Sequence, residues 1–161
     1  MAIELKPDFA VIYRNRGLAY YAKGNYDQAI NDYTKAVELK PDFGAAYHDR
    51  GIAYGAVKGY YDQAIQDHSK AIELMPGYPD AYGYRGFAYS RKGNYDQAIK
   101  DCSKAIQLKP DYTFAYNSRG YAYHRKGNYD QAIADYRKVL EIDPNDKTAK
   151  ANLEDALKKK N

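Results

Sequence analysis

The chain has 161 residues and a net charge of +4, and 45% of its residues are hydrophobic. This composition suits a folded domain and excludes the low hydrophobicity of a disordered chain. No apolar run approaches the roughly 18 residues of a membrane-spanning helix, and residues 1–7 lack the pattern of a secretory signal. We therefore expect no membrane partner, and a cytoplasmic location is favoured. The single cysteine, Cys102, excludes an internal disulfide and a cysteine-cluster metal site.

One short motif returns four times along the chain. Each copy reads Gly, then Asn or Tyr, then Tyr-Asp-Gln-Ala-Ile, and a proline follows each copy. The copies are separated by 34 or 35 residues, a period that indicates a repeat architecture. This period divides the chain into an initial segment, four repeat units and a final segment, which are residues 1–7, 8–41, 42–76, 77–110, 111–144 and 145–161.

Residues 1–7 read like the end of the second half of a repeat, because Ala2 to Pro7 matches Ala36 to Pro41. We interpret them as the remnant of a preceding repeat helix, so the chain is part of a longer array or an engineered array without its own ligand. No polar cap precedes the first unit. Its first helix is therefore expected to expose apolar surface, which suits self-association into a homo-oligomer.

Each unit is expected to form two helices. In the first unit, Tyr13, Gly17 and Tyr20 are spaced i, i+4 and i+7, which draws one stripe along a helix. A glycine inside a helix costs about 1 kcal/mol relative to alanine, so a neighbouring helix should approach closely there. The second helix begins near Asn25, an N-cap candidate with a glutamine three residues later, and stops before Pro41.

The second and third units depart from this pattern. Unit two has one extra residue between Gly55 and Lys58, and it has Tyr60 where the other units have asparagine. We therefore expect an irregular turn there. His68 and Cys102 replace the tyrosine that the first and fourth units have, which predicts less apolar volume between the helices of these two units.

Residues 145–161 close the array in this interpretation. Ala149, Leu153, Ala156 and Leu157 follow a helical spacing, with charged residues elsewhere. Such a helix, apolar on one side and polar on the other, is the terminal cap that repeat arrays need for solubility.

The four units resemble the tetratricopeptide repeat (TPR), which has 34 residues with an aromatic, glycine and tyrosine in its first helix and alanine, aromatic, alanine and proline in its second. In the first unit these positions are Tyr13, Gly17, Tyr20, Ala29, Tyr33, Ala36 and Pro41. The resemblance implies an all-α fold, a right-handed superhelical solenoid of four antiparallel helix pairs with a C-terminal capping helix. It also implies a noncatalytic module for protein–protein interaction, with a concave groove lined by the first helices.

An arginine precedes the glycine of every unit, where the family usually has leucine. An aspartate recurs with each arginine in the second helix. We predict a ladder of ion pairs inside the array, with the arginine stems packed on tyrosine. The arginines are Arg16, Arg50, Arg85 and Arg119, and the aspartates are Asp32, Asp67, Asp101 and Asp135.

The sequence holds no catalytic or cofactor motif. His48, His68 and His124 are its only histidines, and none is paired with another histidine or a cysteine at a metal-ligand spacing. The acid at the start of each second helix fits a helix dipole better than catalysis. We predict no cofactor, no metal site and no enzymatic activity.

The resemblance places the groove at positions three before, one after, and four and five after each glycine. Aromatic side chains beside arginine are enriched in protein interfaces, and the mixture suits a peptide or partner helix with apolar anchors and an acidic group. A solvated surface without a ligand stays open as the alternative. The candidate site residues are Arg14, Leu18, Tyr21, His48, Ile52, Phe87, Arg91, Asn117, Tyr121, His124 and Arg125, and Ser90 lies on the same line of positions.

Two further partners are disfavoured. A TPR subclass that docks the acidic tails of chaperones uses lysine and asparagine at positions that here hold Leu18, Asp49, Asp80 and Tyr84, so we predict no clamp for such tails. Nucleic-acid binding would need a basic groove. Half of the net charge lies in residues 145–161, which leaves little for the repeats.

Overall fold

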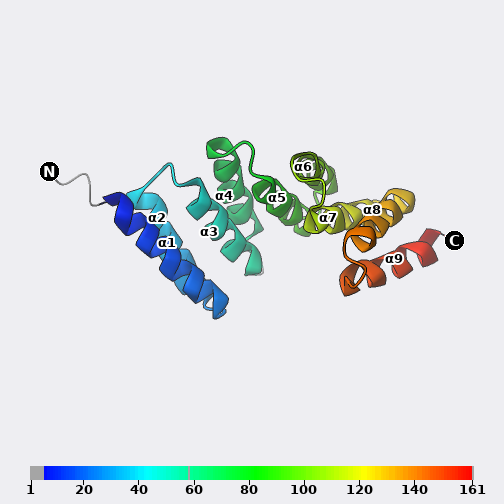
Figure 1. Ribbon diagram of the computed structural model, residues 1–161, viewed down its shortest axis with the longest axis horizontal. Coiled ribbons are helices and arrows are strands. Elements are labelled where there is room, and N and C mark those ends of the chain that lie inside the picture. The colour runs from blue at the N-terminus through cyan, green and yellow to red at the C-terminus, as the bar shows by residue number, and fades with distance from the viewer. Residues whose placement is uncertain (1–5, 58, 161) are drawn as a thin grey trace. The chain divides into compact units, whose positions relative to one another are not determined.

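The computed structural model describes residues 6–57 and 59–160, and within these ranges every regular element is an α-helix (Figure 1). Each repeat forms the two helices that its sequence predicts, joined by a short turn. The helices are α1 (Lys6–Ala22), α2 (Tyr26–Leu39), α3 (Gly44–Ala56), α4 (Tyr61–Leu74), α5 (Pro79–Arg91), α6 (Tyr95–Leu108), α7 (Thr113–Arg125), α8 (Tyr129–Ile142) and α9 (Lys147–Lys160).

The chain forms two compact units, the first ending at Gly77 and the second starting at Tyr78. The first unit holds α1 to α4, and the second holds α5 to α9. In both units the two helices of a repeat pack on each other. The second helix of one repeat also packs on the first helix of the next, α2 on α3 and α6 on α7, while α9 packs on α8 and α7.

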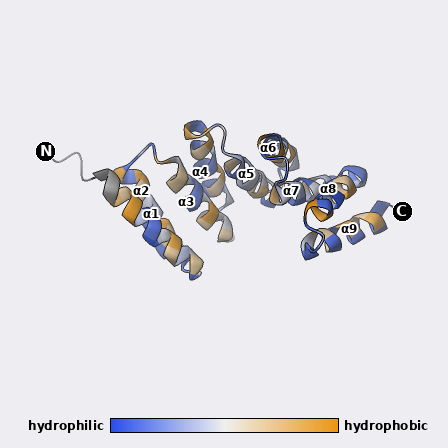
Figure 2. Ribbon diagram, in the orientation of Figure 1, coloured by the Kyte–Doolittle hydropathy of each residue, from blue (hydrophilic) through white to orange (hydrophobic). Residues whose placement is uncertain are grey.

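Alanine dominates the helix contacts. In the first unit, Ala36 of α2 and Ala46 of α3 are fully buried in one cluster with Val37. In the second unit, Ala105 and Ala115 occupy the same positions between α6 and α7. These small side chains allow neighbouring helices to approach closely. Figure 2 shows hydrophobic and hydrophilic residues interspersed along the helices, as expected for helices with one buried side.

The recurring glycines make room for a large side chain from the second helix. A Cβ atom on Gly17 would lie 2.6 Å from Cε1 of Tyr33, and one on Gly120 would lie 2.8 Å from Cε1 of Tyr136. Both tyrosines are almost completely buried. The close packing predicted from the glycine stripe is therefore confirmed.

In the third repeat a cysteine, in place of a tyrosine, lies opposite the glycine of the first helix. A Cβ atom on Gly86 would lie 2.6 Å from Sγ of Cys102, and also 3.1 Å from the backbone oxygen of Ala98. The smaller cysteine thus brings the α6 backbone within reach of α5. The sequence predicted a loss of apolar volume here, and the two helices compensate for that loss by approaching. Cys102 is fully buried, and burial raises the pKa of its thiol.

The turn between the two helices of a repeat depends on a glycine with positive φ. Gly24 has φ of 77°, and the next N–H, that of Asn25, donates to the carbonyl of Tyr20 at 3.0 Å, which satisfies a free carbonyl at the end of α1. In the second repeat the described residues show a different pattern, in which Tyr60 N–H donates to the carbonyl of Val57 at 3.3 Å, and α3 ends in an extended Val57. The predicted irregular turn in unit two is confirmed up to Val57, while residue 58 lies outside the described residues.

Helix capping follows the prediction only in part. The Asn94 side chain accepts a hydrogen bond from the backbone N–H of Gln97 at 3.4 Å. Asn25 and Asn128 make no such bond, so the expected N-cap is present in the third repeat alone among those with asparagine. The glycine turn stabilises the other helix junctions without it.

The arginine and aspartate ladder lies between the two helices of each repeat. Arg50 Nε and Nη2 donate to Asp67 at 2.7 and 2.8 Å, and the guanidinium lies 5.5 Å from the centre of the Tyr47 ring. Arg50 Nη1 also donates to Thr34 of the preceding repeat at 3.1 Å. Burial raises the pKa of Asp67, and the Arg50 contact opposes that rise. The predicted ladder is confirmed, with pairs Arg16–Asp32, Arg50–Asp67, Arg85–Asp101 and Arg119–Asp135.

The two terminal segments differ in how far the structure tests them. Helix α1 begins at Lys6, so residues 6 and 7 belong to α1, whereas residues 1–5 of the expected remnant lie outside the described residues. A proline in the first turn is compatible with this start, because it needs no N–H there. Helix α9 covers α8 through Ala149, Leu153 and Ala156, as a cap would.

Candidate functional site

A cavity of about 300 Å³ lies within the second unit, and residues from three helices line it. Helix α5 contributes three of its residues, α7 four and α9 two. Four of the predicted site residues, Phe87, Arg91, Asn117 and Tyr121, are brought together here. The complete lining is Phe87, Ser90, Arg91, Phe114, Asn117, Ser118, Tyr121, Thr148 and Asn152.

The helical period explains this convergence. On α7, Phe114, Asn117, Ser118 and Tyr121 are spaced i, i+3, i+4 and i+7, so they share one side of the helix. The lining residues of α5 have the same spacing. Because α5 and α7 are the first helices of consecutive repeats and pack on each other, their matching sides face one cavity.

Aromatic rings form the apolar wall of the cavity. The ring of Phe114 stacks on Tyr84 with 4.6 Å between centroids and lies 5.9 Å from the ring of Phe87. Its centroid also lies 5.8 Å from that of the Tyr112 ring. These contacts hold Phe114 in place, so the wall exists before any ligand binds.

Arg125 lies beside this wall without lining the cavity. Its Nη1 donates to the hydroxyl of Tyr121 at 2.8 Å, and its guanidinium lies 5.5 Å from the centre of the Tyr95 ring. The hydroxyl of Tyr121 therefore already has a cationic donor. Together with Arg91 in the lining, Arg125 gives the surroundings of the cavity a positive charge.

Two polar atoms of the lining have no hydrogen-bond partner among the described residues. They are Oδ1 of Asn117 and Oγ of Ser90, and both atoms are buried. The other end of the Asn117 amide is occupied, since Nδ2 donates to Asp146 Oδ2 at 3.2 Å. Asp146 also accepts from the backbone N–H of Ala149 at 2.7 Å, which caps α9.

His124 lies outside this cavity. Its Nε2 is 2.9 Å from Asp155 Oδ2 on α9, and its ring meets Tyr129 edge-on at 5.4 Å. The pKa of Asp155 is lowered, chiefly by the hydrogen bond from Lys159 and also by His124. This predicted groove residue therefore joins α7 to the capping helix.

The predicted site residues of the first unit are dispersed. Arg14 donates to Asp49 of the next repeat at 2.6 Å and lies over Phe43, so its charge is already paired. His48 is 4% exposed and packs on His68 at 5.2 Å. Tyr21 packs on Tyr26, and burial raises its pKa. Leu18 is exposed and Ile52 is half-buried.

Five of the nine lining residues were absent from the predicted set, and one of them, Ser90, lies on a groove position that the resemblance implied. Phe114 and Ser118 stand on the same side of α7 as Asn117, so the helical spacing itself was the signal that pointed to them. Thr148 and Asn152 belong to α9, which the sequence presented only as a cap. The capping helix thus also forms one wall of the cavity.

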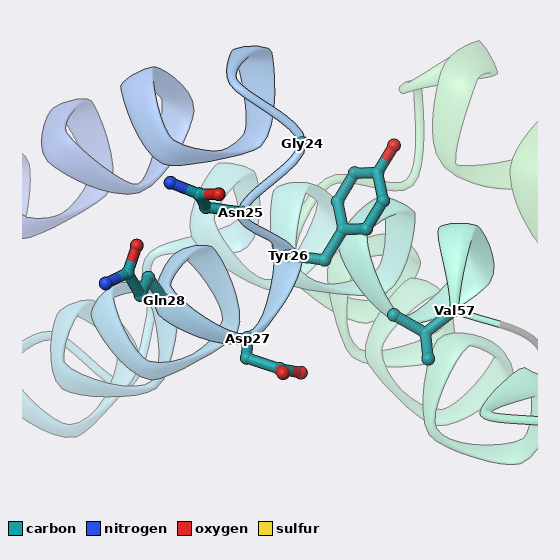
Figure 3. Close-up of a pocket in the computed structure, with 6 residues that line it drawn as sticks. All are labelled: Gly24, Asn25, Tyr26, Asp27, Gln28 and Val57. Atoms are coloured by element: carbon teal, nitrogen blue, oxygen red, sulfur yellow. The ribbon is translucent and has the colours of Figure 1, made fainter.

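A second, more open hollow of about 540 Å³ lies in the first unit, at the start of α2 (Figure 3). Figure 3 shows Asn25 and Gln28 on one side and Tyr26 with Val57 on the other. The hollow lacks an apolar wall of the kind that Phe114 forms. Among the described residues, no group of three or more His, Cys, Asp or Glu side chains could hold a metal ion.

The fold and the ligand-sized groove define a helical repeat protein. The tetratricopeptide repeat model matches residues 10–43, 79–112 and 113–146, and a TPR repeat model matches residues 57–93. These matches cover more than half of the sequence, and the chain belongs to the tetratricopeptide repeat family. Members of this family are generally noncatalytic interaction modules, so the chain is a protein-interaction scaffold in this general sense.

Several solved structures have the same fold. A crystal structure of MamA has a TM-score of 0.83 and 28% identity, over 95% of this chain and 83% of that one. YrrB, described as a TPR protein with an unusual peptide-binding site, has a TM-score of 0.76 and 25% identity, over 99% and 81%. The TPR domain of Sgt2 from Aspergillus fumigatus has a TM-score of 0.68 and 27% identity, over 72% and 78%. No curated protein matches the chain in sequence.

None of the helices in residues 6–57 and 59–160 is both long and apolar enough to cross a membrane.

Proposed function

We propose that the chain is a noncatalytic module that binds a peptide or a partner's helix in the cavity of its second unit. The observation that carries this proposal is the convergence of Phe87, Asn117 and Tyr121 on one apolar cavity with polar atoms in its lining. Concave sites of this composition are typical of ligand binding. The similarity to YrrB, which is described as a TPR protein with an unusual peptide-binding site, supports the same function.

The chemistry of the cavity indicates what a peptide needs. Phe87 and Phe114 offer an apolar surface for one large side chain of the ligand, the kind of contact that dominates binding energy in interfaces. Arg91 and Arg125 favour an acidic group next to that side chain. In the first unit Arg14 is bound to Asp49 and the predicted groove residues are dispersed, so the cavity of the second unit is the stronger candidate.

A selection from a displayed peptide library tests this function. We expect one related family of peptides to be enriched on the native chain, and Phe87→Ala to weaken their binding by about tenfold or more. Leu18→Ala is the matched control, because Leu18 has the same position in the first repeat and is exposed. Equal binding to both variants, or no enrichment at all, would contradict the proposed site.

Self-association is a second candidate function, and the side of α1 that faces away from its neighbours favours it. Phe9, Val11 and Ile12 are exposed, and Ile12 is 59% exposed. The same position in the second and fourth repeats holds Ala46 and Ala115, which are fully buried under the preceding helix. Because α9 already covers α8, we infer that α1 pairs with α1 of a second copy in a symmetric contact.

Sedimentation velocity over a range of concentrations tests this pairing. We expect the average mass of the native chain to rise with concentration toward that of a dimer. Ile12→Glu should keep the chain monomeric, because the charge would be buried in the contact. Leu157→Glu is the control, since Leu157 is an exposed leucine on α9. A native chain that stays monomeric, or equal effects of both variants, would rule out the α1 contact.

A further inference from the structure

One amide in the lining of the cavity, that of Asn117, has an orientation fixed by a neighbouring carboxylate. Asn117 Nδ2 lies 3.2 Å from Asp146 Oδ2, and a carboxylate only accepts hydrogen bonds. Turning the amide over would place Oδ1 against the carboxylate and remove that hydrogen bond. Asp146 therefore holds the amide with its oxygen pointing away from the carboxylate.

Asp146 is itself fixed by the start of α9. Its Oδ1 accepts the backbone N–H of Ala149 at 2.7 Å, as an N-cap residue does. Each carboxylate oxygen thus has one donor, Ala149 for Oδ1 and Asn117 for Oδ2. The hydrogen bond from Ala149 fixes the position of the Asp146 carboxylate, and that carboxylate fixes the orientation of the Asn117 amide.

The result is a buried acceptor without a donor, on a side chain that lines the cavity. Oδ1 of Asn117 is buried and has no partner among the described residues, and the same holds for Oγ of Ser90 on α5. Ser90 is only 4% exposed. A buried polar atom without a hydrogen bond is unfavourable, so a ligand group that satisfies it gains affinity. These two residues are in the same lining as Phe87 and Phe114.

We propose that this cavity selects an apolar side chain next to a neutral N–H donor, such as a peptide amide, and that Asp146 creates this selectivity by orienting Asn117. The inference rests on the proposed function of the same cavity. An amide N–H donates to Asn117 Oδ1, while the hydroxyl of Ser90 can donate to or accept from a neighbouring group. The aromatic wall takes the apolar side chain.

The charges around the cavity argue for a neutral donor over a cationic one. Arg91 is in the lining and Arg125 lies beside it, so an ammonium group would meet like charges. The carboxylate of Asp146 already has donors on both oxygens. A neutral amide avoids both problems.

Two small ligands that differ in one donor test the proposal. N-methyl-3-phenylpropanamide carries one amide N–H group beside its phenyl side chain, and methyl 3-phenylpropanoate has an ester oxygen at the same place and no N–H at all. Both are titrated into the native 161-residue chain, and binding is followed by NMR shifts of residues in α5, α7 and α9. We expect the amide to bind about threefold to tenfold more tightly than the ester, the effect of one hydrogen bond to a buried acceptor.

Asp146→Asn separates orientation from folding. Asparagine is as good an N-cap as aspartate, so α9 keeps its start. When the substituted side chain accepts from Ala149 through its oxygen, its amide nitrogen takes the place of Oδ2 and donates to Asn117. The Asn117 amide then turns over and presents Nδ2 to the cavity, and the preference for the amide ligand should disappear. Asp143→Asn is the control, because Asp143 accepts from the nearby Asn145 N–H at 3.0 Å and does not contact Asn117.

The outcomes distinguish this inference from the proposed function. Tighter binding of the amide, lost in Asp146→Asn and kept in Asp143→Asn, supports it. Equal binding of amide and ester in the native chain, with shifts at the cavity, overturns the inference and leaves the groove function standing. A preference that persists in Asp146→Asn overturns the role of Asp146. Absence of any shift at the cavity overturns the inference, and the peptide selection then decides the groove function separately.

Discussion

Asp67→Ala is expected to lower the stability of the first unit by about 3–5 kcal/mol, the usual effect of removing one partner from a buried ion pair. Arg50 would keep its charge between α3 and α4, where only 16% of its side chain is exposed, and would lose both of its bonds to the carboxylate. Hydrogen exchange of the α3 and α4 amides measures this loss, because it resolves the opening of separate regions.

Asp32→Ala is the matched control for this experiment. It removes the same partner in the first repeat, but 57% of the Arg16 side chain is exposed, so water can solvate the charge that is left. We expect a loss of about 1 kcal/mol or less there. Equal losses in the two variants would show that burial of the arginine is not the cause.

Replacing both members of the buried pair gives a further check on its origin. Arg50→Leu combined with Asp67→Leu should recover most of the lost stability, because apolar residues avoid the desolvation of two charges. Burial is the largest cause of the raised pKa of Asp67, as expected if desolvation opposes the charged form of this carboxylate. A double variant as unstable as Asp67→Ala alone would contradict the argument.

Gly86→Ala is expected to destabilise the second unit by about 3 kcal/mol, the upper part of the range for overpacking. The new methyl group would meet Sγ of Cys102 at 2.6 Å and two backbone atoms, Ala98 O at 3.1 Å and Cys102 N at 3.3 Å. Backbone atoms inside α6 cannot move without shifting the whole helix. Hydrogen exchange of the α5 and α6 amides measures the effect.

Gly55→Ala is the control with the opposite expected sign. Gly55 lies in α3, and a Cβ atom there would have no contact within 4 Å among the described residues. Replacing an unconstrained helical glycine by alanine should stabilise the first unit by about 0.5–1 kcal/mol. If Gly86→Ala were also neutral or stabilising, the close approach of α5 and α6 would not be a constraint on the fold.

The sequence predicts the helices well because each repeat states the same pattern. The spacing of Tyr13, Gly17 and Tyr20 and the proline after each second helix are local signals, and four copies reinforce them. The arginine ladder was predictable for the same reason. The approach of α5 to α6 was not, because the sequence shows that Cys102 is small and does not show whether the helices leave a gap or close it.

A site residue was predictable where its position in the repeat decides its location. It was not predictable where a contact with one particular residue of another helix decides it. Phe87 and Tyr121 face the cavity because their place in the repeat puts them there. Arg14 and His48 hold comparable places, but Arg14 finds an aspartate on the next helix and His48 finds His68. Contacts between residues so far apart in sequence leave no trace in a helical spacing.

Because Cys102 is buried, its reactivity can report the opening of the third repeat. The chain's one thiol is fully buried between α5 and α6 and its pKa is raised, so it cannot react with a thiol reagent while the two helices are together. The rate at which a thiol reagent labels Cys102 therefore measures how often α5 and α6 separate. A ligand that stabilises the second unit should slow that reaction, and the native chain can be followed in this way without an attached dye or an engineered residue.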